Sequence, residues 1–132
     1  MYFNGTTESL ELITSVAGTI HVVANYMDHT AAGGDPDSQE TIITTATTTV
    51  ILAPPGLAST DRQLRSLSIR NTSNSAVNAL TIQKDVSGTN HEVLKVTLQV
   101  GETLLYSESA GQWTVLTSGG QIKIRSGEEA VA

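Results

Sequence analysis

The sequence predicts an all-β protein, an antiparallel β-sandwich of the jelly-roll type with about eight to ten short strands. Apolar and polar residues alternate with a period of two in most segments, and no segment has the spacing of an amphipathic helix. Residues typical of turns, chiefly Gly, Pro, Asn and Asp, separate these segments at intervals of about ten residues. Residues 41–56 contain six threonines in sixteen positions, and threonine favours strands because its branched Cβ is restricted in a helix.

The first half of the chain is predicted to contain an opening strand pair, a loop and two short strands. Residues 10–16 and residues 18–27 both alternate, and we expect them to pair across a turn at residues 17–18. Residues 28–40 are rich in Gly, Pro and Asp, which predicts a long exposed loop. The threonine-rich residues 41–56 predict two short strands, which end before the two prolines because proline cannot donate a hydrogen bond to a sheet.

The second half of the chain is predicted to consist of short strands joined by turns. The alternating segments are residues 64–71, 79–85, 92–100, 103–108, 113–117 and 121–125. Gly88 marks a hairpin turn within residues 85–90, because glycine readily adopts a positive φ. In residues 92–100 four apolar side chains share one face, which makes this segment the clearest strand of the sequence.

The chain has the size of one domain, since 132 residues are enough to bury a single core. We expect an N-terminal arm at residues 1–8, a β-sandwich domain at residues 9–125 and a C-terminal tail at residues 126–132. The absence of cysteine excludes disulfides and thiolate chemistry. No apolar run approaches the roughly 18 residues that cross a bilayer, and the first residues lack the pattern of a signal peptide.

The charge balance argues against polyanionic partners. The sequence has 7 Lys and Arg residues against 13 Asp and Glu residues, a formal net charge of −6 at pH 7. Binding to a nucleic acid or to an anionic membrane requires clustered basic residues. We therefore expect neither a nucleic-acid partner nor a membrane partner.

The candidate metal ligands are scattered along the sequence. The spacing of His21, His29 and His91 is not that of a metal site. A second candidate is an acidic segment whose oxygens could serve a calcium ion, formed by Asp28, Asp35, Asp37 and Glu40. It lacks the ligand order of an EF-hand, so a solvated loop is the favoured interpretation. We predict no metal and no cofactor.

The sequence contains no recognisable catalytic motif. Ser87 precedes a glycine but lacks the G-x-S-x-G pattern of a nucleophile elbow. Glu128 and Glu129 lie in the predicted tail, where no apolar pocket separates the pKa values of the two carboxyl groups. Trp113 could stack against a sugar ring, but its alternation with Val115 favours an aromatic residue of the core or of an interface. The sequence thus predicts a protein that is not an enzyme.

The order of five local motifs resembles a group of small structural proteins of tailed bacteriophages. The motifs are a threonine-rich strand ending in Ala-Pro at residues 53–54, L-x-I-R-N at residues 67–71, a hairpin with Gly88 at its tip, G-E-x-L-x-Y at residues 101–106 and G-x-W-x-V-L at residues 111–116. The resemblance implies a β-sandwich virion component, a capsid decoration (cement) protein that binds the outside of the shell and stabilises it.

The resemblance also implies partners and a location. The partners are the major capsid protein and copies of the chain itself, in a homotrimer or a homodimer. The location is the capsid surface of the virion, after synthesis in the host bacterial cytoplasm. The resemblance implies no catalytic residue and no cofactor.

The first three residues are the candidate anchor to a partner. Met1, Tyr2 and Phe3 place two adjacent aromatic rings ahead of a polar linker, which favours burial against a neighbouring subunit. The alternative is that they fold back onto their own sandwich. Two other functional classes remain open: a tail-fibre, head-fibre or receptor-binding module that binds carbohydrate, and a small enzyme or lectin on a jelly-roll scaffold.

Overall fold

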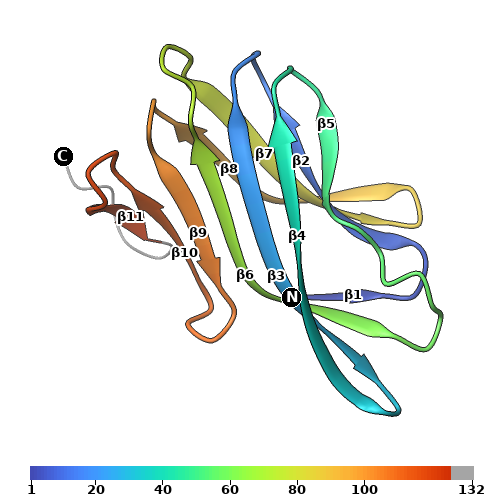
Figure 1. Cartoon of the computed structure of the whole chain (residues 1–132). Helices are drawn as coiled ribbons and strands as arrows, with labels where there is room; N and C mark the ends of the chain where they lie inside the picture. The colour runs from blue at the N-terminus through green and yellow to red at the C-terminus, as the bar shows by residue number, and fades with distance from the viewer. Residues whose placement is uncertain (126–132) are drawn as a thin grey trace.

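The computed structural model describes residues 1–125, which form eleven β-strands and no helix (Figure 1). The strands are β1 (Tyr2–Asn4), β2 (Glu8–Thr14), β3 (Ile20–Thr30), β4 (Gly33–Ile43), β5 (Thr48–Leu52), β6 (Asp61–Asn71), β7 (Asn78–Val86), β8 (Thr89–Leu98), β9 (Thr103–Ser107), β10 (Gln112–Leu116) and β11 (Ile122–Arg125). The prediction of an all-β protein is confirmed, but the predicted eight to ten short strands are eleven in the described residues, and β3, β4 and β6 are each eleven residues long. A helix able to cross a bilayer is therefore absent from these residues.

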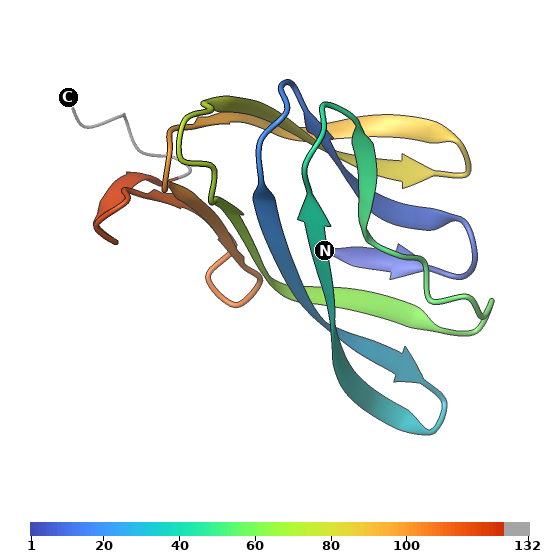
Figure 2. The same ribbon diagram turned by 45° about the horizontal axis from the view of Figure 1, so that its top comes forward.

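The strands pair antiparallel in two sheets. The large sheet has seven strands in the order β11-β10-β9-β6-β3-β4, and β1 pairs with the first residues of β6. The small sheet has four strands in the order β5-β2-β7-β8. Figure 2 shows the small sheet, with its yellow β7–β8 hairpin, on one side of the large sheet.

Side chains from both sheets form one hydrophobic cluster. It arises from the period-two alternation, because Ile20, Val22 and Ala24 of β3 are buried whereas the intervening His21 and Val23 are exposed. The largest fully buried side chains are Phe3, Leu10, Leu12, Ile20, Ile51, Leu52, Leu64, Leu67, Ile69, Leu80, Ile82 and Leu98. Both sheets therefore depend on the same core.

Two predicted breaks in the chain are confirmed. The threonine-rich segment contains a break between β4, which ends at Ile43, and the short strand β5 from Thr48 to Leu52, just before the prolines. The first of the two predicted short strands is instead the end of the eleven-residue β4. The hairpin β7–β8 turns at Ser87 and Gly88, whose φ values are 52° and 90°. Two positive φ values are typical of a type I′ turn, which matches the twist of the flanking strands.

The predicted loop at residues 28–40 is wrong. Strand β3 continues to Thr30, and β4 pairs with it along its whole length from Gly33 to Ile43. Only Ala31 and Ala32 form the turn. Pro36 is compatible with this strand because β4 lies at the edge of the large sheet, where its missing N–H leaves no neighbour unsatisfied.

The predicted pairing of residues 10–16 with residues 18–27 is also wrong. Strand β2 lies in the small sheet beside β5 and β7, and β3 lies in the large sheet beside β4 and β6. Both strands have a buried apolar face. Placing them in different sheets lets the two faces meet in the shared cluster, whereas pairing them in one sheet would leave the cluster without a second layer.

The predicted N-terminal arm at residues 1–8 is not separate from the domain. Strand β1 pairs with Asp61, Arg62 and Gln63 of β6. Phe3 is fully buried in the cluster, and burial of a phenylalanine ring stabilises a fold by roughly 2–3 kcal/mol. The predicted tail at residues 126–132 lies outside the described residues.

Candidate functional site

The three histidines lie apart. His21 and His29 are on β3, eight positions from each other, and His91 is on β8 of the other sheet. Nε2 of His29 lies 3.0 Å from Oε1 of Gln63, so this ring has a partner within the chain. In the part of the chain that the structure describes, no group of three His, Asp or Glu side chains could hold a metal ion.

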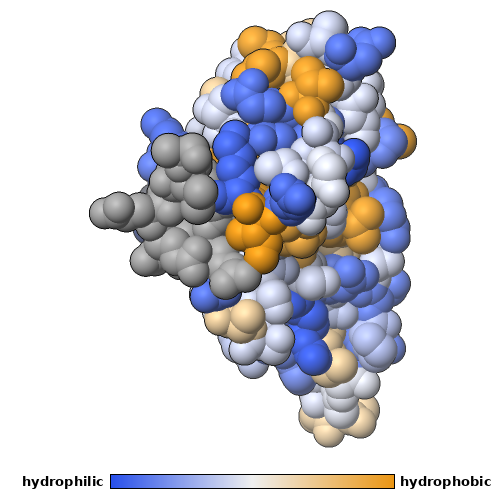
Figure 3. Space-filling view, turned by 90° about the vertical axis from the view of Figure 1, so that its left-hand side faces the viewer, coloured by the Kyte–Doolittle hydropathy of each residue, from blue (hydrophilic) through white to orange (hydrophobic). Residues whose placement is uncertain are grey.

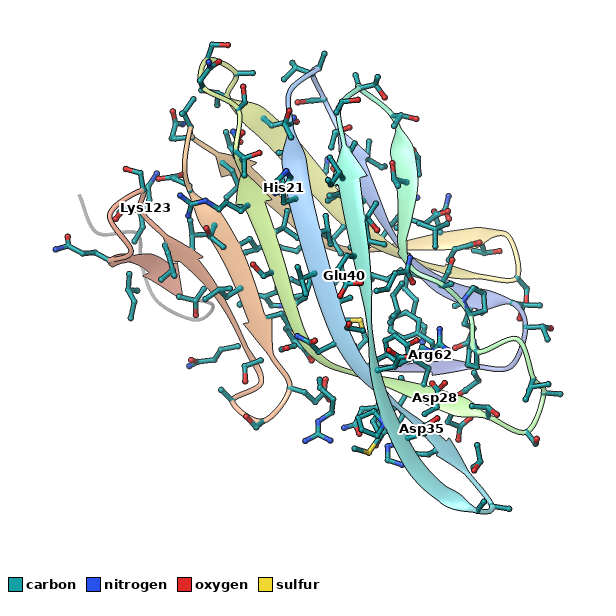
Figure 4. All side chains as sticks on the ribbon, in the orientation of Figure 1. His21, Asp28, Asp35, Glu40, Arg62 and Lys123 are labelled. Atoms are coloured by element: carbon teal, nitrogen blue, oxygen red, sulfur yellow. The ribbon has the colours of Figure 1, made fainter. Side chains whose placement is uncertain are left out.

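A buried polar cluster surrounds Arg62, a residue that the sequence analysis did not single out. Its guanidinium binds both carboxylate oxygens of Asp28, with Nε–Oδ1 and Nη2–Oδ2 distances of 2.8 and 3.0 Å. It also donates to the carbonyl oxygen of Ala53 at 2.9 Å and lies 4.0 Å from the centre of the Tyr26 ring. The hydrogen bond to Asp28 raises the pKa of Arg62. The cluster joins β3, β6 and the segment after β5 (Figure 4).

The four carboxylates considered as candidate calcium ligands do not form a metal site. Asp28 is bound by Arg62, and Figure 4 shows Glu40 far along β4 from Asp35. Oδ1 of Asp37 accepts a hydrogen bond from the backbone of Ser38. Asp35 and Asp37 lie on one face of β4, on which Asp35 is paired with Asp28, whereas Glu40 points to the opposite face.

A second polar cluster contains the ammonium group of Met1. This group and the hydroxyl of Tyr106 both donate to Oε2 of Glu108. Burial alone would raise the pKa of Glu108, but the two hydrogen bonds lower it below its usual value. Burial and the hydrogen bond to Glu108 raise the pKa of Tyr106. Trp113 packs on Tyr106 with 4.6 Å between ring centres and contacts the core.

The three candidate anchor residues have different environments. Phe3 is fully buried in the chain's own core, and Met1 is partly buried against that core. Tyr2 alone among the three has half of its surface exposed, at 49%. Since alternate residues of β1 point to opposite sides, the first segment cannot present both rings to a partner. The anchor hypothesis therefore reduces to Tyr2.

The largest continuous candidate surface is the face of the large sheet that points away from the core. We call it the outer face. Paired residues place three rows of side chains on it: Ile42, His21, Arg70, Thr103 and Leu116; Glu40, Val23, Ser68, Leu105 and Thr114; and Ser38, Asn25, Ser66, Ser107 and Gln112. This face has a partial signal in the sequence, because residues 18–27 alternate between an apolar set and a mixed set.

Aliphatic side chains are exposed on the outer face. Ile42 is 67% exposed and Val23 is 38% exposed, and both line a shallow hollow of about 500 Å³ together with His21 and Glu40. Figure 3, seen from the β10–β11 side, also shows apolar side chains gathered among hydrophilic ones. Serine and threonine occupy six of the fifteen positions of the outer face.

Ser87, the one serine considered as a nucleophile, lies in the β7–β8 turn and its hydroxyl contacts that of Thr7 at 3.0 Å. Comparisons with known proteins add no assignment, because no family model, no curated protein and no solved structure matches the chain.

Proposed function

We propose that this chain is a non-enzymatic structural protein of a bacteriophage virion, a decoration protein that binds the outer surface of the major capsid shell and stabilises it. The observation that carries the proposal is the outer face, where small hydroxyl side chains and exposed aliphatic side chains cover five strands. A flat face with few charges suits burial against another protein. The sequence resemblance to phage structural proteins supplies the class of partner.

The proposal includes a jelly-roll β-sandwich. Strands β2 to β9 are divided four and four, as β8-β7-β2-β5 and β9-β6-β3-β4. Five of the seven links between consecutive strands cross from one sheet to the other, and the hairpins β3–β4 and β7–β8 are the other two. This order supports a jelly roll in which the chain begins at a shifted position, because both sheets keep the strand neighbours of that fold.

Self-association is part of the same proposal. Capsid shells present positions of two-fold and three-fold symmetry, and a homodimer or homotrimer that repeats the local symmetry gains several attachment points at once. Weak contacts of each copy then combine into strong attachment.

A second candidate function is a receptor-binding module of a tail fibre or head fibre. A hollow of about 470 Å³ between β3, β4 and β6 is lined by Asn25, Tyr26, Asp37 and Arg65, among others. Polar side chains around an aromatic ring are typical of sites that bind carbohydrate. This hollow shares Asn25 and Ser38 with the outer face, so the two candidate functions use overlapping surfaces.

The test is a binding experiment with the full chain and capsids stripped of accessory proteins. We expect the chain to cosediment with the capsids, to raise the temperature at which the shell disrupts, and to appear on the outer surface in cryo-electron microscopy. Binding to host cells or glycans without binding to capsids would replace the proposal by the receptor-binding alternative. The variant Tyr2→Ala, which leaves the buried Phe3 in place, tests the remaining anchor residue in the same assay.

A further inference from the structure

We infer that the outer face of the large sheet is the surface through which two copies of this chain associate, related by a two-fold axis that passes over β3. The inference rests on the self-association within the proposed function and names the surface that mediates it. It does not depend on where the dimer is attached.

The composition of the outer face is that of an interface core. Of its fifteen paired positions, Glu40 and Arg70 alone carry a full charge. Depletion of charge distinguishes the centre of an interface from the rest of a protein surface. Val23 lies at the centre of the β3 row, beside Ser68 on β6 and Glu40 on β4. Val23 and the neighbouring Ile42 are exposed aliphatic side chains that a second copy of this face can cover.

The two charges of the outer face have no ionic partner within residues 1–125. The guanidinium of Arg70 donates to Oγ1 of Thr103 at 3.0 Å and forms none of the ion pairs among these residues. The carboxylate of Glu40 accepts a hydrogen bond from the hydroxyl of Ser38 at 2.7 Å and likewise forms no ion pair there. Both charges are therefore available to a partner.

The positions of these two charges are self-complementary. Arg70 lies on β6 opposite His21, and Glu40 lies on β4 opposite Val23, so the charges are on the two sides of β3 and in adjacent rows. When two such faces meet around a two-fold axis that runs along β3 within the interface, β6 of each copy lies over β4 of the other, and Arg70 comes within one row of the other copy's Glu40. A two-fold interface uses the same patch on both subunits, so one choice of axis satisfies all four charges.

The outward face of the small sheet lacks this property. Lys95 on this face is paired with Glu92, with 3.6 Å between Nζ and Oε1. The charges of this face that form no ion pair among residues 1–125, Glu11 and Asp85, are both negative and therefore cannot pair with each other across a two-fold axis. Val50 on this face is 40% exposed, close to the 38% of Val23. Val50 therefore provides a matched control for a substitution at the centre of the outer face.

The experiment measures the mass of the full chain in solution by sedimentation over a range of concentrations. We expect a dimer, a dissociation constant raised about tenfold or more by Val23→Lys, and no comparable change from Val50→Lys. Arg70→Glu and Glu40→Arg should each weaken the dimer, and the double variant that exchanges the two charges should restore it. Circular dichroism and melting temperature establish that each variant is folded.

The outcomes separate this inference from the proposed function. A wild-type chain that remains monomeric or forms a trimer overturns the inference, as do equal effects of Val23→Lys and Val50→Lys. A monomeric Val23→Lys variant that still binds capsids supports the dimer surface and shows that the capsid contact lies elsewhere. A charge-dependent dimer that binds no capsid supports the inference and removes the decoration function.

Discussion

The two long hairpins, β3–β4 and β7–β8, occupy equivalent places in the two sheets and are built from opposite kinds of sequence. Each supplies an edge strand, β4 of eleven residues in the large sheet and β8 of ten residues in the small sheet. Strand β4 is polar and contains a proline, whereas β8 alternates apolar and polar residues along most of its length. Yet each has a single fully buried residue, Ile43 in β4 and Leu98 in β8.

The hairpins also turn in different ways. In β7–β8 the backbone of Ser87 and Gly88 supplies the positive φ values that the turn requires. In β3–β4 the hydroxyl of Thr30 accepts a hydrogen bond from the N–H of Ala32 and lies 3.3 Å from the carbonyl oxygen of Gly33. A strand at a sheet edge therefore needs little apolar surface of its own when its partner strand also pairs with a further strand, as β3 does with β6.

The variant with the largest expected effect on stability tests whether the buried part of β8 is confined to its C-terminal end. Leu98→Ala should lower the free energy of unfolding by about 3–4 kcal/mol, because it removes a fully buried side chain and leaves a cavity. Leu94→Ala, in the same strand but half-buried, should cost about half as much. Urea unfolding measures both. Equal losses of unfolding free energy would show that the alternation of β8, and not its position at the sheet edge, determines which of its side chains are buried.

The next test breaks the support of the β3–β4 hairpin. Asp28→Ala leaves the guanidinium of Arg62 buried without its carboxylate partner and should cost about 2–3 kcal/mol. Asp35→Ala, in the same hairpin but exposed, should change stability by less than about 0.5 kcal/mol. Hydrogen exchange should show the loss of protection concentrated in β3 and β4. If both variants change the free energy of unfolding equally, the ion pair of Asp28 with Arg62 does not stabilise this hairpin.

A smaller effect compares the two turns directly. Asparagine tolerates the left-handed region, so Gly88→Asn, at φ 90°, should cost less than about 1 kcal/mol. Gly33 has φ 125°, outside that region, so Gly33→Asn should cost about 1–3 kcal/mol. Thermal unfolding of the two variants gives the difference. Gly119→Asn is the control, since that glycine has no positive φ.

The smallest expected effect is a change in acid stability, in a region outside both hairpins. The folded pKa of Glu108 lies below its usual value of 4.5, so its contribution to stability is present above that pH and is lost as the pH falls through the folded pKa. Glu108→Gln should therefore reduce the fall in melting temperature between about pH 5 and pH 3. The exposed Glu92→Gln is the control and should leave that fall unchanged. A profile that is identical in wild type and Glu108→Gln would contradict the assignment.

The strands and turns of this protein follow from local patterns in its sequence. Period-two alternation predicted the strands, the prolines after Leu52 ended one of them, and Gly88 predicted the β7–β8 turn. Each of these depends on a few neighbouring residues. The mixed character of residues 18–27 likewise predicted one apolar and one mixed face of β3, and the exposed Val23 and His21 agree with it.

Which strands lie side by side depends on the tertiary fold and could not be read from the local patterns. Alternation fixes which side chains of a strand share a face, but it does not name the neighbouring strand. The polar residues 33–43 form a strand because they pair with the free edge of β3. Strands β2 and β3 lie in different sheets because each has an apolar face that is buried against the other sheet. The contact of Asp28 with Arg62 joins residues 34 positions apart. The outer face itself exists because five strands from distant parts of the sequence come into register, and their order is settled by the core they bury together.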